Sequence, residues 1–412
     1  MTSRRLPALV GFLVLVLGIA VVLAVGAGAG RRNVPARVSV PRVFPGSSHL
    51  TADSTRSPLG RGVALYRQGA GVGIAGTPQV LVQGSDGRGT RTVDVALDRG
   101  RGDVLGDPAP ATLSPDGSLV VVGERRATPA ATDLVEITTA TGAERVVRLP
   151  AARGVVPVAW SQDSRYLAYV GADATNVVES AVAGPLFVLD TRSGRSEVLT
   201  DDVTAAAFSP DGSRVAVQSP GSPRIRVLDR SGRTVDQLLA PDRARIAGGA
   251  AWSPDGSLLA VFDDVRDQVR FVPVAATAVV PAPVPSGGRV LGWLSRTELL
   301  VPAPLTSVGD GDQRLLRADL AEGDTSVWAS VPTAGARYAV RDVTLATALL
   351  PRAQLVAGGD VDRGPWPLGL RIGFVVAGAV LSSFSVVGLQ RRAAAVGSLV
   401  ATPAWSTDSS ID

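Results

Sequence analysis

Short apolar runs recur along the central part of the sequence, and most of them follow the same polar turn. Four copies of this unit, each a bulky or apolar residue, a Ser-Pro-Asp-Gly-like turn and an apolar run, occupy residues 111–122, 158–169, 206–217 and 250–261. A weaker fifth copy at residues 291–302 keeps the bulky residue and the apolar run but lacks the turn. The bulky residues are spaced by 47, 48, 44 and 41 positions, and they are Leu113, Trp160, Phe208, Trp252 and Trp293. A period in the forties predicts the blades of a β-propeller, with these residues packed between blades.

The turn residues have a structural explanation. Proline presets the backbone angle of the second turn position, aspartate accepts hydrogen bonds from nearby N–H groups, and glycine adopts the left-handed conformation that reverses the chain. We therefore interpret these positions as hairpin tips. The positions concerned are Ser114, Pro115, Asp116, Gly117, Ser209, Pro210, Asp211, Gly212, Ser253, Pro254, Asp255 and Gly256, with Asp163 in the copy that carries Gln162 and Ser164 instead of Pro and Gly.

A second hairpin signal follows each apolar run, and two hairpins per unit give four strands per blade. These six segments are residues 80–95, 134–149, 186–200, 225–239, 269–280 and 315–329. Residues 61–67 resemble the second strand of a first blade, while residues 336–350 could begin a seventh blade or close the ring. The expected fold is thus an all-β propeller of six or seven blades over residues 59–358, preceded by a linker at 31–58 that could add a closing strand.

The repeat resembles a known family. A Trp or Phe before Ser-Pro-Asp-Gly, followed by an apolar strand and later by a strand that ends in Asp190 or Asp229 before a Ser-Gly-Arg turn, is similar to the WD40-like repeat of the TolB-like propellers. The resemblance is good over residues 111–261 and implies a TolB-like β-propeller. Together with the two apolar ends described below, we expect a membrane-anchored bacterial member of that family. The resemblance speaks for the fold alone, because such propellers serve unrelated functions.

Two apolar segments flank the repeats. Residues 6–25 contain no charge, and residues 368–389 contain only Arg371, so each is long enough to span a bilayer. We expect an anchor or signal segment within residues 1–30, a transmembrane helix at 367–390, and a short disordered cytoplasmic tail at 391–412. The arginines outside the two segments favour cytoplasmic termini and an extracytoplasmic propeller. Small residues at Gly369, Gly373 and Ala377 could pair this span with the first one or with a second copy.

Composition and charge exclude several kinds of chemistry. The chain has no cysteine and a single histidine, His49, so His/Cys metal sites and thiol catalysis are excluded, and no Gly-x-Ser-x-Gly motif is present. The net charge of +4 comes from 41 basic residues, all arginine, spread along the chain, which does not indicate nucleic-acid binding. The glycines at 71, 73 and 76 precede a Thr-Pro pair and not a helix, so we expect no phosphate loop. We expect no cofactor and no metal, although Asp263, Asp264 and Asp267 could contribute to a cation site.

The functional hypothesis follows partly from these exclusions. A rigid β scaffold with variable loops suits a binding or scaffold module, here for a protein or glycan partner in the cell envelope. The alternative is a carboxylate-dependent hydrolase with its site at the propeller axis. Carboxylates that converge at the mouth of the propeller funnel would favour the enzyme, and a flat or arginine-lined mouth would favour binding.

Overall fold

The fold was analysed in a computed structural model. It describes residues 37–46, 48–68, 78–100, 108–124, 133–150, 154–172, 182–304, 312–332 and 341–366, together with Gly373, Val376 and Ala377. The chain divides into two compact units, one of Arg31–Gly364 and one of Met1–Gly30 with Pro365–Asp412. In the second unit Gly373, Val376 and Ala377 are helical.

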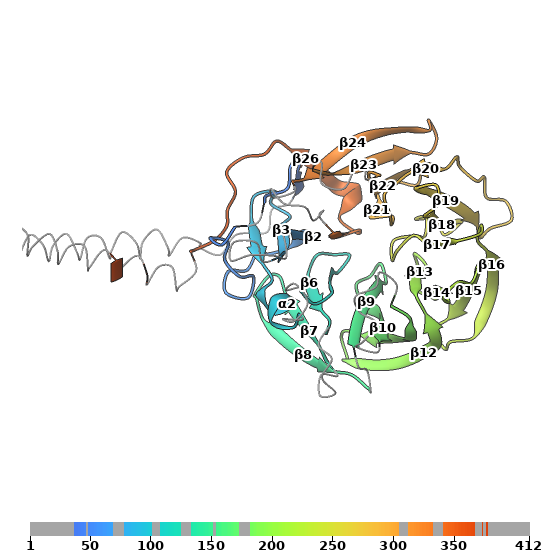
Figure 1. The fold of residues 1–412 in the computed structure, drawn as a ribbon, viewed down its shortest axis with the longest axis horizontal. Coiled ribbons are helices and arrows are strands. Elements are labelled where there is room, and N and C mark those ends of the chain that lie inside the picture. Colours follow the sequence, from blue (N-terminus) through green and yellow to red (C-terminus); the bar gives the residue numbers. More distant parts are fainter. Residues whose placement is uncertain are drawn as a thin grey trace, which may run out of the picture. The chain divides into compact units, whose positions relative to one another are not determined.

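Arg31–Gly364 folds as a propeller of six four-stranded antiparallel sheets (Figure 1). Counted from the axis outward, blade 1 is β25 (Arg341–Leu345), β2 (Gly62–Gln68), β3 (Gln79–Gly84) and β4 (Thr90–Thr92). Blade 2 is β5 (Ala111–Leu113), β6 (Leu119–Val122), β7 (Asp133–Thr138) and β8 (Glu144–Arg148). Blade 3 is β9 (Gly154–Trp160), β10 (Tyr166–Ala172), β11 (Gly184–Asp190) and β12 (Arg195–Val203).

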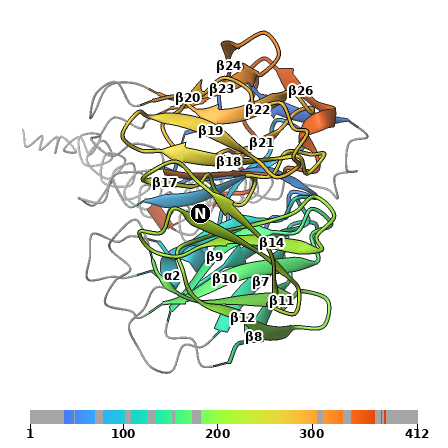
Figure 2. The same ribbon diagram turned by 90° about the vertical axis from the view of Figure 1, so that its right-hand side faces the viewer.

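The second half of the ring repeats this arrangement. Blade 4 is β13 (Ala205–Phe208), β14 (Arg214–Gln218), β15 (Arg224–Asp229) and β16 (Thr234–Leu239). Blade 5 is β17 (Ala244–Ile246), β18 (Leu258–Asp263), β19 (Gln268–Pro273) and β20 (Val284–Pro285). Blade 6 is β21 (Gly292–Trp293), β22 (Glu298–Pro302), β23 (Gln313–Asp319) and β24 (Asp324–Val331). Figure 2 shows the same blades after a turn of 90°.

The number of blades is therefore six, and residues 336–350 do not begin a seventh. Instead β25 pairs with β2, so that Leu65 lies opposite Thr344 and Ala64 opposite Leu345. This confirms the alternative that residues from both ends of the propeller close the ring, and it confirms residues 61–67 as a second strand. Figure 1 shows β2 and β3, from the start of the chain, beside β23 and β24 from its end. Because the ring is closed in this way, no sheet edge is left exposed between the first and the last blade.

The predicted hairpins are present, with one change. Residues 269–280 were expected to form both outer strands of their blade, but the partner of β19 is β20 at Val284–Pro285. The intervening residues 274–283 form no strand. This segment lacks the glycine that the other five second hairpins carry in a short turn, so the chain takes a longer path before it pairs.

The segment at residues 31–58 is more than a linker where it is described. β1 (Val38–Pro41) pairs in parallel with β26 (Ala353–Val356), and Val40 and Phe44 are fully buried. This pair is a separate two-stranded sheet and adds no strand to a blade. The short helix α2 (Asp94–Asp98) lies between blades 1 and 2 in the sequence, and the 3-10 helix η2 (Leu350–Arg352) follows β25.

Burial explains the strand sequences. The second strands lie between neighbouring blades and bury both faces, as in β18, all of whose six residues are buried. The outermost strands face solvent, as in β8, where only Val147 is buried. The expected anchors pack against the preceding blade: Leu113 clusters with Leu65 and Val82, and Trp160 with Val121 and Leu134. A blade cannot bury both faces alone, so this packing makes the ring one cooperative unit.

Candidate functional site

The Ser-Pro-Asp-Gly turns connect the first and second strands of their blades. In blade 2, Ser114 Oγ donates a hydrogen bond of 2.7 Å to Asp116 Oδ1, and Leu119 N donates one of 2.9 Å back to Ser114 Oγ. The same serine to aspartate bond is 2.6 Å long in blades 3, 4 and 5, where Asp163, Asp211 and Asp255 accept it. The repeated aspartates therefore hold the turn closed, and their carboxylates are engaged in structure.

These hydrogen bonds predict a pH dependence of stability. Ser209 Oγ and both donors of Ser213 bind Asp211 and lower the pKa of its carboxyl from 3.8 to about 2. Because the folded-state pKa is the lower one, this stabilisation is present above about pH 4 and is lost as the pH falls towards 2. We expect the Asp211→Asn variant to be less stable than the wild type at neutral pH, with the difference shrinking below pH 4. Urea unfolding across this pH range measures it, and a constant difference would contradict the expectation.

The degenerate copy in blade 3 makes contacts that the other turns do not. Ser164 has a φ of 59°, in the region that glycine occupies in the other copies, and its Oγ accepts a hydrogen bond of 3.0 Å from Asp116 N in blade 2. Gln162 replaces the turn proline, and its Oε1 accepts a hydrogen bond of 3.1 Å from Thr347 Oγ1. The departures from the repeat thus join blade 3 to blade 2 and to the segment that follows β25.

A cavity lies at the propeller axis. It has a volume of about 380 Å³ and is lined by residues of the first strand of every blade or the segments next to them. Each first strand is at the end of its sheet and pairs on one side only. The unpaired backbone edges of these strands therefore face the cavity, which we call the axial channel. An unpaired edge can accept an extended peptide as an additional strand.

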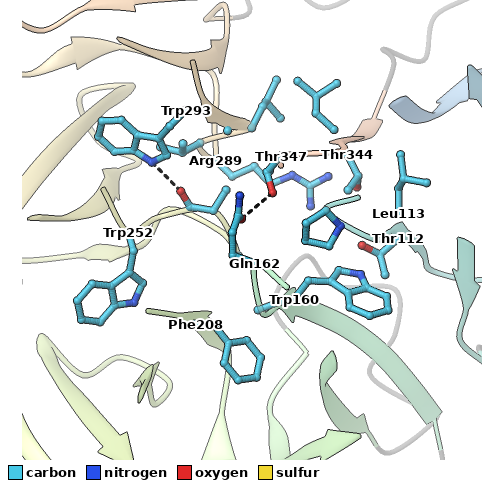
Figure 3. Close-up of a pocket in the computed structure, with 18 of the residues that line it drawn as sticks. Thr112, Leu113, Trp160, Gln162, Phe208, Trp252, Arg289, Trp293, Thr344 and Thr347 are labelled. Carbon is cyan, nitrogen blue, oxygen red and sulfur yellow. Dashed lines mark hydrogen bonds between the residues drawn. The ribbon is translucent and has the colours of Figure 1, made fainter. Parts of the chain in front are cut away.

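The five bulky repeat residues surround the axial channel. In Figure 3 the labelled side chains of Trp160, Phe208, Trp252 and Trp293 lie around its centre, and the rings of Phe208, Trp252 and Trp293 point away from it. Trp252 Nε1 donates to Ala207 O of the preceding blade at 3.1 Å, and Trp293 Nε1 donates to Ala250 O at 3.0 Å. The buried Trp160 Nε1 has no such partner among the described residues. Trp252 and Trp293 are therefore packing residues, and their rings point away from a ligand in the channel.

One end of the channel is covered by residues 346–352, which we call the cap segment. Ala346 N donates to Val63 O at 2.9 Å, and Ala348 N donates to Pro115 O of blade 2 at 3.0 Å. Thr347 reaches Gln162 of blade 3, which is not a neighbour of blade 1, so this bond crosses the end of the channel (Figure 3). The cap segment thus spans three blades on the side of the Ser-Pro-Asp-Gly turns.

Arg289 marks the other end of the channel. It precedes β21, and its Nη2 donates a hydrogen bond of 3.0 Å to the carbonyl oxygen of Val343, the middle residue of β25. The residue is exposed, and the described part of the chain provides no carboxylate partner for it. Among the described residues that line the channel, Arg289 is the only charged one, and none is Asp or Glu. The described lining of the axial channel therefore offers hydrogen-bond donors and one cation, and it contains no pair of carboxylates for hydrolysis.

A second cavity, of about 370 Å³, lies among the turns of blades 2 and 3. Its lining includes Asp116, Asp163, Glu136 and Arg145. Burial raises the pKa of the Glu136 carboxyl, while the hydrogen bond and charge of Arg145 oppose the shift. The other carboxylate oxygen of Glu136 is buried and accepts no hydrogen bond from the described residues. This cleft carries mixed charges, and its aspartates are those already engaged in the turns.

The remaining candidate residues lie apart from the axial channel. His49 is exposed and does not line the channel. The carboxylate of Asp263 accepts a hydrogen bond of 2.9 Å from Arg266 Nη1, and Arg270 Nη1 lies at 3.8 Å, so two arginines offset its charge. No cluster of three metal-ligating side chains occurs within the described ranges. The glycines at 71, 73 and 76 lie outside these ranges, as do most of the two apolar segments.

The sequence did not identify Arg289 or Thr347 as site residues. Neither belongs to the repeated unit, and both reach the channel through segments that connect blades. Gln162 did stand out, since it departs from the Ser-Pro-Asp-Gly pattern. A departure from a structural repeat was thus the one signal that pointed to the channel.

Two solved proteins resemble this chain at low sequence identity. It is similar to TolB from Acinetobacter baumannii, with a TM-score of 0.47 and 14% identity over 69% of this chain and 67% of TolB. It is also similar to an oligogalacturonate lyase solved in complex with manganese, with a TM-score of 0.43 and 14% identity over 69% of this chain and 77% of the lyase. No protein-family model and no curated protein matches the sequence. The six blades confirm the β-propeller that the repeats predicted.

Proposed function

We propose that this protein is a membrane-anchored binding module whose propeller holds a partner at the axial channel. The observation that carries the proposal is the channel itself, which combines unpaired strand edges, an exposed arginine and no described carboxylate. A hydrolase at the axis would need two carboxylates there. The described lining has none, which favours binding over the carboxylate-dependent hydrolase.

Of the two kinds of partner, the channel favours a protein over a glycan. Sugar rings are commonly held on exposed aromatic faces, whereas the rings of Phe208, Trp252 and Trp293 point away from the channel (Figure 3). Backbone N–H and C=O groups on the inner strand edges suit an extended polypeptide, which can pair with them. The partner is therefore proposed to be a protein of the cell envelope.

Filling the channel tests this role. Thr344 lies on β25 and lines the channel, so Thr344→Trp would occupy the space that a partner needs. Crosslinked partners should be recovered from membranes with the wild-type protein and be reduced about tenfold with this variant, a loss of about 1.4 kcal/mol of binding free energy. Thr325→Trp, on the exposed outer strand β24, is the matched control and should capture partners normally.

Two results would count against the binding role. One is equal capture by Thr344→Trp and Thr325→Trp, provided that circular dichroism shows both variants folded. The other is recovery of no protein at all with the wild type. If Thr344→Trp fails to fold, Thr112→Trp, which enters the channel from blade 2, replaces it.

The anchoring part of the proposal rests on the two apolar segments at residues 6–25 and 368–389. Within the described ranges, no helix combines the length and the apolar character that crossing a bilayer requires. We propose that both segments span the cell membrane, that the termini are cytoplasmic and that the propeller is extracytoplasmic. Protease added outside spheroplasts should then digest the propeller. A propeller that is protected until the membrane is broken would have the opposite orientation.

A further inference from the structure

We infer that the axial channel recognises the free carboxyl terminus of a partner polypeptide, with the last side chain inside the channel and the terminal carboxylate on Arg289. This inference rests on the proposed function and gives its partner a chemical identity. It depends on three features of the channel: the single cation, the cap segment and the space between them.

Arg289, the one charged residue in the described lining, suits a ligand with a single negative charge. Arg289 donates one hydrogen bond to Val343 O and retains further N–H groups at an exposed position. A guanidinium presents up to five N–H donors in a planar fork that matches a carboxylate. No other described lining residue carries a charge, so a ligand with one carboxylate balances the site. A strongly acidic surface would leave its further charges without partners.

The cap segment limits how far a ligand can enter. Thr347 and Pro351 line the channel, and the bond from Thr347 to Gln162 crosses its far end. A polypeptide that entered beside Arg289 would therefore meet residues 346–352 and could not pass straight through. A volume of about 380 Å³ holds a side chain with a short piece of backbone. The channel thus suits the end of a chain better than its middle.

The way a ligand's carboxylate and apolar side chain are joined favours a chain terminus over an internal acidic residue. At a carboxyl terminus the carboxylate and the last side chain are attached to the same Cα, so both reach one site. In an extended internal segment, adjacent side chains point to opposite faces. An internal acidic residue would direct its carboxylate to Arg289 while its neighbour pointed away from the channel. Residues two apart share a face, but they lie about 6.5 Å apart along the strand.

The lining near Arg289 suits an apolar last residue. Val290 follows Arg289 in the sequence, and Val343 accepts the hydrogen bond of Arg289. Both line the channel, as do Val158 and Ala250, and none of the four carries a polar side chain. Burying an aliphatic side chain among such residues favours binding through the hydrophobic effect. The unpaired edges of β9 and β25 offer backbone groups to the residues that precede the terminus. We therefore assign the ligand as a carboxyl terminus that ends in a residue such as leucine or valine.

Synthetic peptides test the assignment with the full-length protein in detergent or nanodiscs. The probes are fluorescein-labelled Gly-Ser-Gly-Ser-Gly-Leu with a free carboxylate, the same peptide with an amidated terminus, and an amidated peptide with glutamate two residues before the leucine. Fluorescence anisotropy should show at least about tenfold tighter binding of the free acid than of either amide. Arg289→Gln should remove this preference. Arg296→Gln, an exposed arginine of the same blade outside the channel, should keep it.

Three outcomes would overturn the assignment: equal binding of acid and amide, an unchanged preference in Arg289→Gln, or no saturable binding of the free acid up to about 1 mM. Tight binding of the internal glutamate peptide would point to an acidic loop instead of a terminus. If partner capture is lost in Thr344→Trp but the peptides show no preference for the free acid, the proposed binding role stands. The assignment of the ligand as a free carboxyl terminus is then wrong.

Discussion

Gly117→Ala is expected to lower the free energy of unfolding by about 3–4 kcal/mol, one of the two largest effects of a single substitution considered for this propeller. A Cβ atom at this position would lie 2.0 Å from the carbonyl oxygen of Gly62, and the φ of 71° is unfavourable for alanine. The turn would have to move away from β2. That movement would also disturb the hydrogen bond of 2.8 Å from Gly62 N to Gly117 O.

Gly212 provides the matched control, because it occupies the same position of the turn in blade 4. Its φ is 68°, but the nearest atom to a new Cβ is Ser161 Cβ at 3.6 Å. Gly212→Ala should therefore cost only the backbone strain, about 1 kcal/mol. Chemical unfolding followed by tryptophan fluorescence compares the two variants. Equal midpoints would show that the close approach of blades 1 and 2 is unimportant.

Arg91→Ala is expected to cost about 3–5 kcal/mol, the range found when one partner of a buried ion pair is removed. The Arg91 side chain is only 1% exposed and lies 3.1 Å from Asp362 Oδ2. Its Nε donates to Ser57 O at 2.8 Å, and its Nη1 donates to the carbonyl oxygens of Thr90 and Asp362 at 2.8 and 2.7 Å. One guanidinium therefore joins the segments before and after the propeller to β4.

The Asp362→Asn variant tests the negative charge of Asp362 separately from the hydrogen bonds that Asp362 accepts from Arg91. The backbone oxygen of Asp362 would still accept from Arg91, and the amide would keep the side-chain volume, so we expect a smaller loss, about 1 kcal/mol. Hydrogen exchange should show increased opening of residues 57–62 and 353–364 in Arg91→Ala and little change in blade 4. An equal loss of hydrogen-exchange protection in all six blades would contradict a local role for Arg91.

The repeated turns explain how much of the fold the sequence could predict. Proline, aspartate and glycine at fixed positions report local backbone geometry, and local geometry is encoded in adjacent residues. For this reason blades 2 to 5 could be placed from the sequence, with the exception of β20. Blade 1 was harder, because β25 pairs with a strand nearly three hundred positions earlier, and no local pattern reports such a pairing.

The axial channel likewise combines residues that the sequence could predict with residues that it could not. The repeat residues were expected to pack between blades, and their side chains belong to the buried clusters between neighbouring blades, while the same residues also line the channel: Leu113, Trp160, Phe208, Trp252 and Trp293. Arg289 carries no local signature, because an arginine before a strand is an ordinary surface residue. Its role depends on the convergence of six inner strands, and the distance of 3.0 Å to Val343 O exists only in the closed ring.

The sequence by itself determined the repeated unit, its turns and the apolar segments at the two ends, since each depends on residues that are close together in the chain. The tertiary structure decided the number of blades, the strand that closes them and the residues that meet at the axis. These features depend on contacts between distant segments, whose geometry is set by how the blades pack around the ring. The four Ser-Pro-Asp-Gly-like turns therefore predicted a propeller, and only its closure revealed the channel with Arg289 at one end and Gln162 with Thr347 at the other.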